Sequence, residues 1–239
     1  MPPPARPRGL LFDLEGTLLT QKRWDPAEGA VRLLMLARNA LDTTPEIVRQ
    51  RMAELHAALR VRRVEAGIEL PMRARLKILF ERLGIVFETP AADLEWEMWR
   101  ESLWLIPEPG AVDAMIDVMH RELPAGVVTN NPFTGETVIR ELKIHGLDET
   151  LRFVISSADY GVRKPDPLIF HTAVGRLGVD PTKVWHVGNS SEIDMVGAKA
   201  AGLRTVWYNP EGKVLPPSVN PDGEIRSWAD FPALLDRGL

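Results

Sequence analysis

Two carboxylates and a glycine follow a short apolar run near the start of the chain. Residues 10–12 are apolar, and Asp13, Glu15 and Gly16 come directly after them. Such a run is typical of a buried strand, and at the carboxyl end of a parallel strand Asp13 would lie where open α/β sheets bind ligands. A carboxylate there can act as a nucleophile, and a second acid can protonate a leaving group. The alternative is that Asp13 only ends a strand and starts a turn.

Polar side chains also lie near the ends of later apolar runs and the starts of the helices predicted after them. They are Thr129, Asn130, Lys164, Asn189 and Asp194. Because the carboxyl ends of parallel strands share one edge of a sheet, we expect these residues to meet the opening pair of acids there. A hydroxyl and a lysine can hold an anion, and oxygen ligands suit Mg²⁺. Together the residues favour transfer of a phosphoryl group from an ester to an aspartate and then to water.

Short strand-like runs alternate with helical patterns in the second half of the chain. Alternation of this kind predicts βα units and a mostly parallel sheet, which residues 10–12 must join. The predicted strands are residues 126–129, 153–155, 184–187 and 204–207, and the predicted helices are residues 111–121, 133–145, 166–177 and 192–201.

The pattern between about residues 25 and 104 is helical throughout, and we predict a block without strands. Pro26 and Pro45 follow Asp25 and Thr44, which is typical of helix starts. The predicted helices are residues 26–40, 45–66, 72–83 and 91–103, with a linker at 106–110. We therefore predict an α/β protein with two domains. The parallel-sheet core consists of residues 1–20 and 106–239, and the inserted helical-bundle cap consists of residues 21–105.

Composition excludes several classes of protein. The chain has 239 residues, a net charge of −4 with both signs interspersed, and no cysteine. We therefore expect no nucleic-acid partner, no disulfide and no thiolate metal site. The leader of residues 1–7 is rich in proline, and no apolar segment reaches signal-peptide or membrane-spanning length. A cytoplasmic protein without a membrane partner is expected.

Four motifs in order resemble those of the haloacid dehalogenase superfamily of hydrolases. They are DLEGTLL, VVTNN, GVRKPDPLIF and VGNSSEIDMVGAKAAGL, and they extend over nearly the whole chain. Any one of them is a weak signal, whereas the ordered set is specific. The resemblance implies a Rossmann-like core with a mobile helical cap inserted after the first motif, which agrees with the pattern of strands and helices.

The resemblance also implies roles for individual residues. Asp13 would be the nucleophile and a direct magnesium ligand. Glu15 would be the general acid and base, and its backbone carbonyl would be a second metal ligand. Thr129 would bind the phosphoryl group together with the backbone near Asn130. Lys164 would neutralise charge on both the nucleophile and the phosphate, which makes it a catalytic and substrate-binding residue.

The fourth motif would complete the metal site, and it departs from the family's usual pattern. Asn189 and Asp194 would hold magnesium directly or through water, but the family usually has Asp where this chain has Asn189. An amide lacks the charge of a carboxylate, so weaker metal affinity is expected. The family's phosphatases most often have Asp where this chain has Glu15, and Glu keeps the same acid chemistry.

Three functions remain open on the sequence alone. The first is a magnesium-dependent phosphatase of a small phosphorylated metabolite. The second is a protein with little catalysis that binds a phosphorylated ligand or a protein partner, which the missing carboxylate at Asn189 motivates. The third is a metal-independent 2-haloacid dehalogenase. We expect His186, in the strand before the fourth motif, to be packed rather than catalytic.

Overall fold

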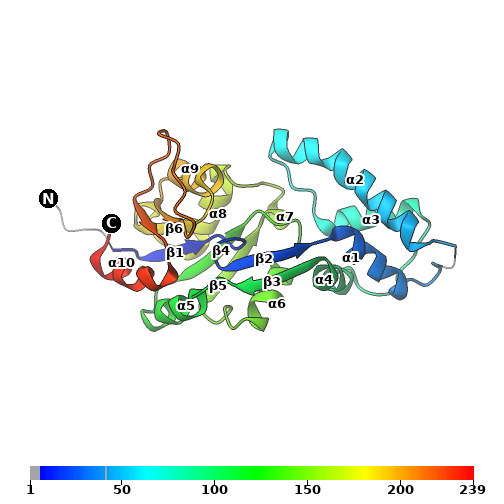
Figure 1. Cartoon of the computed structure of the whole chain (residues 1–239), viewed down its shortest axis with the longest axis horizontal. Helices are drawn as coiled ribbons and strands as arrows, with labels where there is room; N and C mark the ends of the chain where they lie inside the picture. Colours follow the sequence, from blue (N-terminus) through cyan, green and yellow to red (C-terminus); the bar gives the residue numbers. More distant parts are fainter. Residues whose placement is uncertain (1–5, 41) are drawn as a thin grey trace.

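The chain folds into a sheet-containing part and a helical part that lie end to end (Figure 1). The computed structural model describes residues 6–40 and 42–239, and of residues 61–65 it describes the backbone alone. Residues 1–5, which hold most of the proline-rich leader at the start of the predicted core, and residue 41 in the predicted cap lie outside the described residues.

A parallel sheet of six strands forms the centre of the first part, as the alternating pattern predicts. Its strand order is β5-β4-β1-β6-β7-β8, so the strand from the start of the chain lies in the middle. In register, Leu10 pairs with Ala125 on one side and with Trp185 on the other. The strands are β1 (Gly9–Phe12), β4 (Ala125–Thr129), β5 (Leu151–Ser156), β6 (Val184–Gly188), β7 (Arg204–Tyr208) and β8 (Gly223–Ile225).

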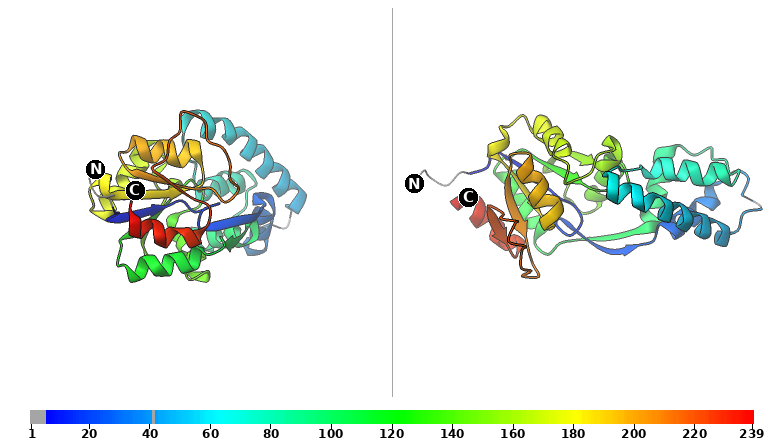
Figure 2. Two further views of the ribbon diagram at one scale, coloured as in Figure 1. Left: turned by 60° about the vertical axis from the view of Figure 1, so that its left-hand side comes forward. Right: turned by 90° about the horizontal axis from the view of Figure 1, so that it is seen from above.

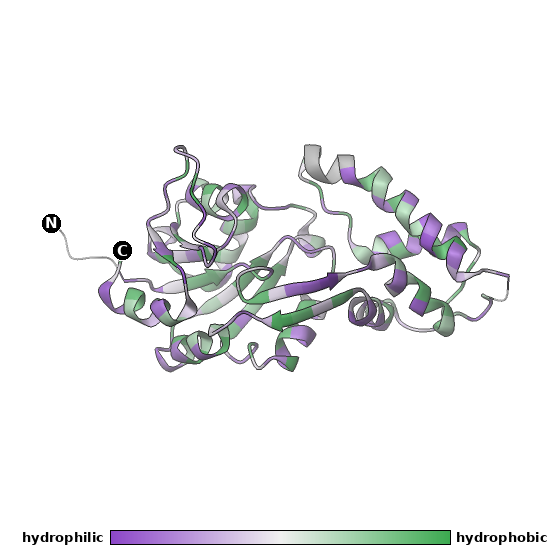
Figure 3. Ribbon diagram, in the orientation of Figure 1, coloured by the Kyte–Doolittle hydropathy of each residue, from purple (hydrophilic) through white to green (hydrophobic). Residues whose placement is uncertain are grey.

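Helices cover both faces of the sheet, because successive side chains of a strand point to opposite sides. Leu11 packs into one cluster with α8 and α9, while Leu10 and Phe12 pack into another with α5, α6 and α10. The strands of the sheet are accordingly largely apolar (Figure 3), and Figure 2 shows the helices on the two sides of the sheet. The helices are α5 (Ala111–His120), α6 (Gly135–Ile144), α7 (Ser157–Tyr160), α8 (Pro167–Leu177), α9 (Val196–Ala200) and α10 (Phe231–Arg237).

Four helices make up the second part, which we call the helical block (residues 26–102). They are α1 (Pro26–Leu33), α2 (Pro45–Ala66), α3 (Met72–Arg82) and α4 (Ala91–Ser102). The predicted start signals are confirmed, since the side chains of Asp25 and Thr44 accept hydrogen bonds from the backbone N–H three residues later. The first helix is shorter than predicted and ends in a turn of 3₁₀ helix. Within the described part of the chain, no helix is long and apolar enough to cross a membrane.

The prediction that about residues 25–104 hold no strand is wrong at the carboxyl end of that block, where a strand begins at Leu103. The antiparallel strands β2 (Leu19–Trp24) and β3 (Leu103–Pro107) join the two parts, with Leu19 opposite Pro107 and Trp24 opposite Leu103. The predicted linker therefore begins as a strand, and both predicted domain boundaries fall inside this ribbon. Its two strands are far apart in sequence and joined by no tight turn, so no local hairpin signal marks them.

Aromatic packing joins the helical block to the sheet part. Trp99 of α4 is buried against Phe133, which follows β4, with ring centroids 5.0 Å apart. Trp24 of β2 contacts the same ring at 6.0 Å. The N–H of Met72 at the start of α3 also donates to the carbonyl oxygen of Pro132 at 2.7 Å. The helical block is thus seated on the loop that follows β4.

Substitution of Gly126 in β4 tests the packing of the sheet. A Cβ on Gly126 would lie 2.4 Å from the Phe153 ring, so Gly126→Val should lower the free energy of unfolding by about 2 kcal/mol. Urea unfolding followed by circular dichroism measures it. Gly175 in α8 is the matched control, because nothing lies within 4 Å of its Cβ position and Gly175→Ala should stabilise slightly. Equal stability of Gly126→Val and the native chain would contradict this packing.

Candidate active site

Asp13 lies directly after β1, at the carboxyl edge of the sheet. Its N–H continues the ladder by donating to the carbonyl oxygen of Val187 at 2.9 Å. Its side chain is buried, with Oδ1 accepting from Lys164 Nζ at 2.6 Å and Oδ2 from the hydroxyl of Thr17 at 3.2 Å. The predicted nucleophile therefore has an ammonium partner and a defined orientation.

Lys164 lies between two buried carboxylates. Its Nζ also donates to Asp194 Oδ1 at 2.7 Å. Burial disfavours the charged ammonium, but the two carboxylates outweigh this and raise the pKa of Lys164 above its ordinary value. Burial raises the pKa of Asp13 above its ordinary value, and the positive charge of Lys164 reduces this rise. A charged lysine at this distance favours the ionised form of Asp13.

The backbone of Lys164 is held by Asn130, which follows β4. Asn130 Nδ2 donates to the Lys164 carbonyl oxygen at 2.9 Å, and Asn130 Oδ1 accepts from the Lys164 N–H at 2.7 Å. The side chain of Asn130 thus places Lys164. Phosphoryl binding by the backbone near Asn130 stays a prediction.

Asp194 is held on both of its oxygens. Oδ1 also lies 3.0 Å from His186 Nε2, and Oδ2 accepts from the N–H of Ser190 at 3.0 Å. Burial raises its pKa, but Lys164 and His186 more than reverse this, so the pKa of Asp194 is well below its ordinary value. His186 is packed against Phe170, as expected, and it also orients this carboxylate.

Glu15 has different partners from Asp13, although the two residues are close in sequence. Its Oε1 accepts from Asn131 Nδ2 at 2.6 Å, and its Oε2 lies 3.5 Å from the buried hydroxyl of Thr129, the outer limit of a hydrogen bond. Burial and the charge of Asp13 raise the pKa of Glu15 to about 7. Near neutral pH this carboxyl group can both give and take a proton.

Two residues of the site were not assigned from the sequence. They are Asn131, the strongest partner of Glu15, and Thr17, which donates to Asp13. Both lie inside the predicted motifs, directly beside assigned residues, and that position is the only signal they carry. An amide and a hydroxyl are common in turns, so their residue types alone indicate no contact with a carboxylate.

Asn189 lies against the turn that follows Asp13. A Cβ on Gly16 would be 2.1 Å from Asn189 Nδ2, and Gly16 has a φ of +78°, so both the contact and the backbone require glycine there. The carbonyl oxygen of Asn189 accepts from Trp207 Nε1 at 3.0 Å. A cavity of about 390 Å³ opens beside this turn, and its lining includes Glu15, Gly16 and Asn189.

The predicted metal ligands differ in how free they are to bind an ion. Among the described residues, no group of three or more His, Asp or Glu side chains could hold a metal by itself. The predicted set instead combines the Asp13 carboxylate, the Glu15 carbonyl oxygen and the Asn189 amide. Asp194 already accepts three hydrogen bonds. A set of oxygen ligands with only one or two carboxylates suits Mg²⁺, because this ion keeps several of its bound water molecules.

The chain matches the family model of the haloacid dehalogenase-like hydrolases over residues 7–202. It is 29% identical over 132 residues to the pyrimidine 5'-nucleotidase YjjG of Escherichia coli, a match covering 54% of this chain and 56% of the nucleotidase. It is 24% identical over 210 residues to the ribulose-1,5-bisphosphate 5-phosphatase of Halopiger xanaduensis, covering 84% of each.

The similarity to solved structures extends over nearly the whole chain. The HAD-hydrolase YfnB from Bacillus subtilis, solved bound to magnesium, is 26% identical with a TM-score of 0.59, covering 97% of this chain and 99% of that one. The matches to two relatives cover less. The chain spans about half the length of the nucleotidase and of the phosphoserine phosphatase of Thermus thermophilus.

The raised pKa of Glu15 predicts a dependence of stability on pH. A carboxyl whose folded pKa is about 7 and unfolded pKa about 4.5 binds its proton more tightly when folded, so stability falls as pH rises from 4.5 through 7. Glu15→Gln removes this loss and should be more stable than the native chain at pH 8 by about 2 kcal/mol. The difference should be much smaller at pH 5.

Urea unfolding at the two pH values measures this. The matched control is Glu149→Gln on the surface, which should behave as the native chain at both. A stability difference for Glu15→Gln that is the same at pH 5 and pH 8 would contradict the raised pKa.

Proposed function

The chain belongs to the haloacid dehalogenase-like hydrolases, and we propose that within this family it is a magnesium-dependent phosphatase of a small phosphorylated metabolite. The observation that carries the proposal is the different pairing of its two adjacent acids. Asp13 contacts the Lys164 ammonium, whereas Glu15 is held by the neutral donors Asn131 and Thr129. The ammonium favours the ionised form of Asp13, whereas Glu15 can carry a proton.

This division matches the two tasks of ester hydrolysis through a covalent intermediate. Asp13 attacks phosphorus, the bond from phosphorus to the ester oxygen breaks, and Glu15 gives its proton to the departing alcohol. Glu15 then takes a proton from water as that water attacks the aspartyl phosphate. Inorganic phosphate leaves, and both acids return to their starting protonation states.

The other residues of the site stabilise charge during these steps. Lys164 lies 2.6 Å from Asp13 and would contact the phosphoryl oxygens from the same position. Thr129, buried at the end of β4, and the backbone N–H groups after it would bind a further phosphoryl oxygen. Asp194 and Asn130 keep Lys164 in place.

Magnesium fits the oxygen donors of the site. Asp13, the carbonyl oxygen of Glu15 and the side chain of Asn189 would hold it, with Asp194 acting through water because its oxygens are already in use. A bound magnesium ion would neutralise charge on the phosphoryl oxygens. Support comes from the solved structure of YfnB, which contains magnesium.

The helical block would act as a cap on the site, with residues 1–20 and 106–239 as the core and residues 21–105 as the cap. The block is seated on the loop after β4, the strand that ends at Thr129. A cap in this position would exclude water and contact the leaving group. Relatives named as phosphatases and a nucleotidase support a phosphorylated substrate.

Substitution of the nucleophile tests the proposed reaction. We expect slow, magnesium-stimulated release of phosphate from 4-nitrophenyl phosphate, and Asp13→Asn should lower kcat by about 10³-fold or more, because an amide cannot replace the attacking carboxylate. The matched control is Asp113→Asn on the exposed side of α5, which should keep native activity.

The other outcomes separate the alternatives. No turnover of any phosphate ester with any divalent ion would contradict the phosphatase and favour a protein that only binds phosphorylated ligands. Chloride release from 2-chloropropionate in the presence of a metal chelator would instead identify a dehalogenase.

Restoring a carboxylate in the fourth motif tests the metal site. Asn189→Asp should tighten magnesium binding by roughly tenfold, because it adds a negative charge beside the turn that follows Asp13. Without magnesium the same charge should destabilise the site, so the variant should gain more thermal stability from added magnesium than the native chain. Calorimetric titration and thermal unfolding measure these effects, with Asn220→Asp as the exposed control. An unchanged titration would show that Asn189 does not face the metal.

A further inference from the structure

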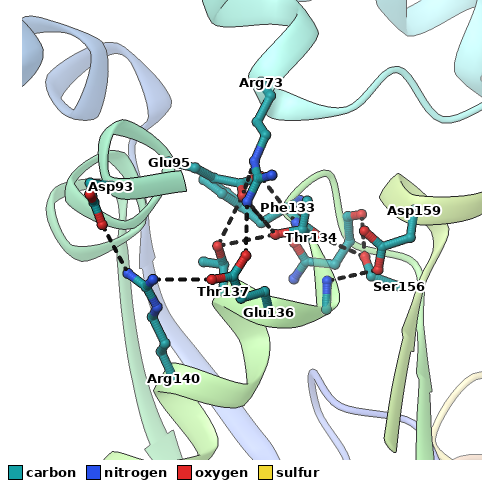
Figure 4. Close-up of polar contacts among 12 residues, drawn as sticks. Arg73, Asp93, Glu95, Phe133, Thr134, Glu136, Thr137, Arg140, Ser156 and Asp159 are labelled. Carbon is teal, nitrogen blue, oxygen red and sulfur yellow. Dashed lines mark hydrogen bonds and ion pairs between the residues drawn. The ribbon is translucent and has the colours of Figure 1, made fainter. Parts of the chain in front are cut away.

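Glu95 of α4 is a fully buried carboxylate whose partners come mostly from the other part of the molecule (Figure 4). Its Oε2 accepts from the hydroxyls of Thr134 and Thr137 at 2.7 Å and 3.0 Å, and from Arg73 Nε of the helical block at 2.8 Å. Its Oε1 accepts from the backbone N–H of Thr134 at 3.1 Å. Four donors therefore hold one carboxylate, and three of them belong to the sheet part.

These contacts cap a helix from outside its own segment. Thr134 is the N-cap residue of α6, but its side chain accepts no capping hydrogen bond from the first turn. Glu95 takes the N–H of Thr134 instead, and Asp159 takes the N–H of Gly135 at 2.9 Å. Helix starts need such acceptors, and a carboxylate there is also favoured by the helix dipole.

The loop in front of this helix leads to Glu15. The N–H of Phe133 donates to Asn131 Oδ1 at 2.9 Å, and Asn131 Nδ2 donates to Glu15 Oε1 at 2.6 Å. The Phe133 ring is itself packed against Trp99, on the same helix as Glu95. Glu95 contacts Thr134, and Asn131 contacts Glu15. Only two residues separate Thr134 from Asn131 in the chain.

We propose that Glu95 is a positioning residue for Glu15, because it holds the loop of residues 131–134 in the conformation in which Asn131 contacts that acid. This inference rests on the proposed phosphatase function, in which Glu15 is the proton donor. Because Glu95 belongs to the helical block, Glu15 is oriented only while the block is seated on this loop. Contact of the helical block with this loop and the correct placement of Glu15 then occur together.

The charge of Glu95 makes Glu95→Gln the informative substitution. The carboxylate accepts on both oxygens, whereas an amide can accept on one and presents N–H groups on the other. In one orientation of the amide, its NH₂ group faces the Thr134 N–H. In the other orientation, it faces the three donors that contact Glu95 Oε2. The control is Glu136→Gln, an exposed residue that pairs with the same Arg73 at 3.3 Å (Figure 4).

A comparison of leaving groups separates positioning from general damage. Dinitrophenolate leaves without a proton, whereas an alkoxide needs one from Glu15. Glu95→Gln should lower kcat/KM, which reports the steps up to departure of the alcohol, by about tenfold or more for an alkyl phosphate such as glycerol phosphate, and by less than about threefold for 2,4-dinitrophenyl phosphate. Glu136→Gln should leave both rates near the native values. Equal slowing of both substrates by Glu95→Gln would overturn the proposal.

A second readout does not depend on activity. The side-chain amide of Asn131 is assigned in ¹H–¹⁵N spectra by its absence in Asn131→Ala. In Glu95→Gln it should shift and exchange its protons with water several-fold faster, while Glu136→Gln leaves it unchanged. An unmoved Asn131 amide would overturn the proposal. If the native chain hydrolyses neither substrate, the phosphatase function fails and this spectrum alone decides the role of Glu95.

A milder variant covers the case in which Glu95→Gln does not fold. Thr137→Val removes one donor to Glu95 without a change of charge or much change of volume. It should shift the Asn131 amide and the ratio of the two rates in the same direction by a smaller amount. No shift in either would count against the proposal.

Discussion

The ammonium of Lys164 between Asp13 and Asp194 is the interaction on which the site depends. Two buried carboxylates would repel each other at the edge of the sheet, and the buried lysine would be costly alone. Together they form a compact group in which each charge has a partner at 2.6–2.7 Å. Because Asn130 holds the backbone of the central Lys164 and His186 contacts Asp194, the position of Asp13 is set by residues from four segments of the chain.

The parallel sheet explains how these segments meet. β1 lies between β4 and β6, so the residues after all three strands come together at one edge. Asp13 is at the middle of that edge and Glu15 is on the turn beyond it. Their different neighbours, rather than their residue types, divide the roles: a cation beside one acid and neutral donors beside the other.

The helical block adds to this edge through buried polar contacts as well as aromatic packing. Glu95 and Trp99 lie on one helix and both reach the loop after β4, the first through hydrogen bonds to Thr134 and the second through the Phe133 ring. A buried carboxylate is stable only when its donors are in place. The contact between the two parts therefore has a defined geometry, which simple apolar packing would not require.

The sequence by itself determined the class of fold, the order of most helices and strands, and which motif residues meet at the edge of the sheet, because these follow from local patterns of apolar residues, caps and spacing. The ribbon of β2 and β3 was missed, since pairing between strands about 80 residues apart leaves no local pattern. Tertiary structure alone decided that Asn130 holds Lys164, that Asn131 holds Glu15 and that Glu95 contacts Thr134. Each is a hydrogen bond between segments distant in sequence, and only the folded chain determines which donor meets which acceptor.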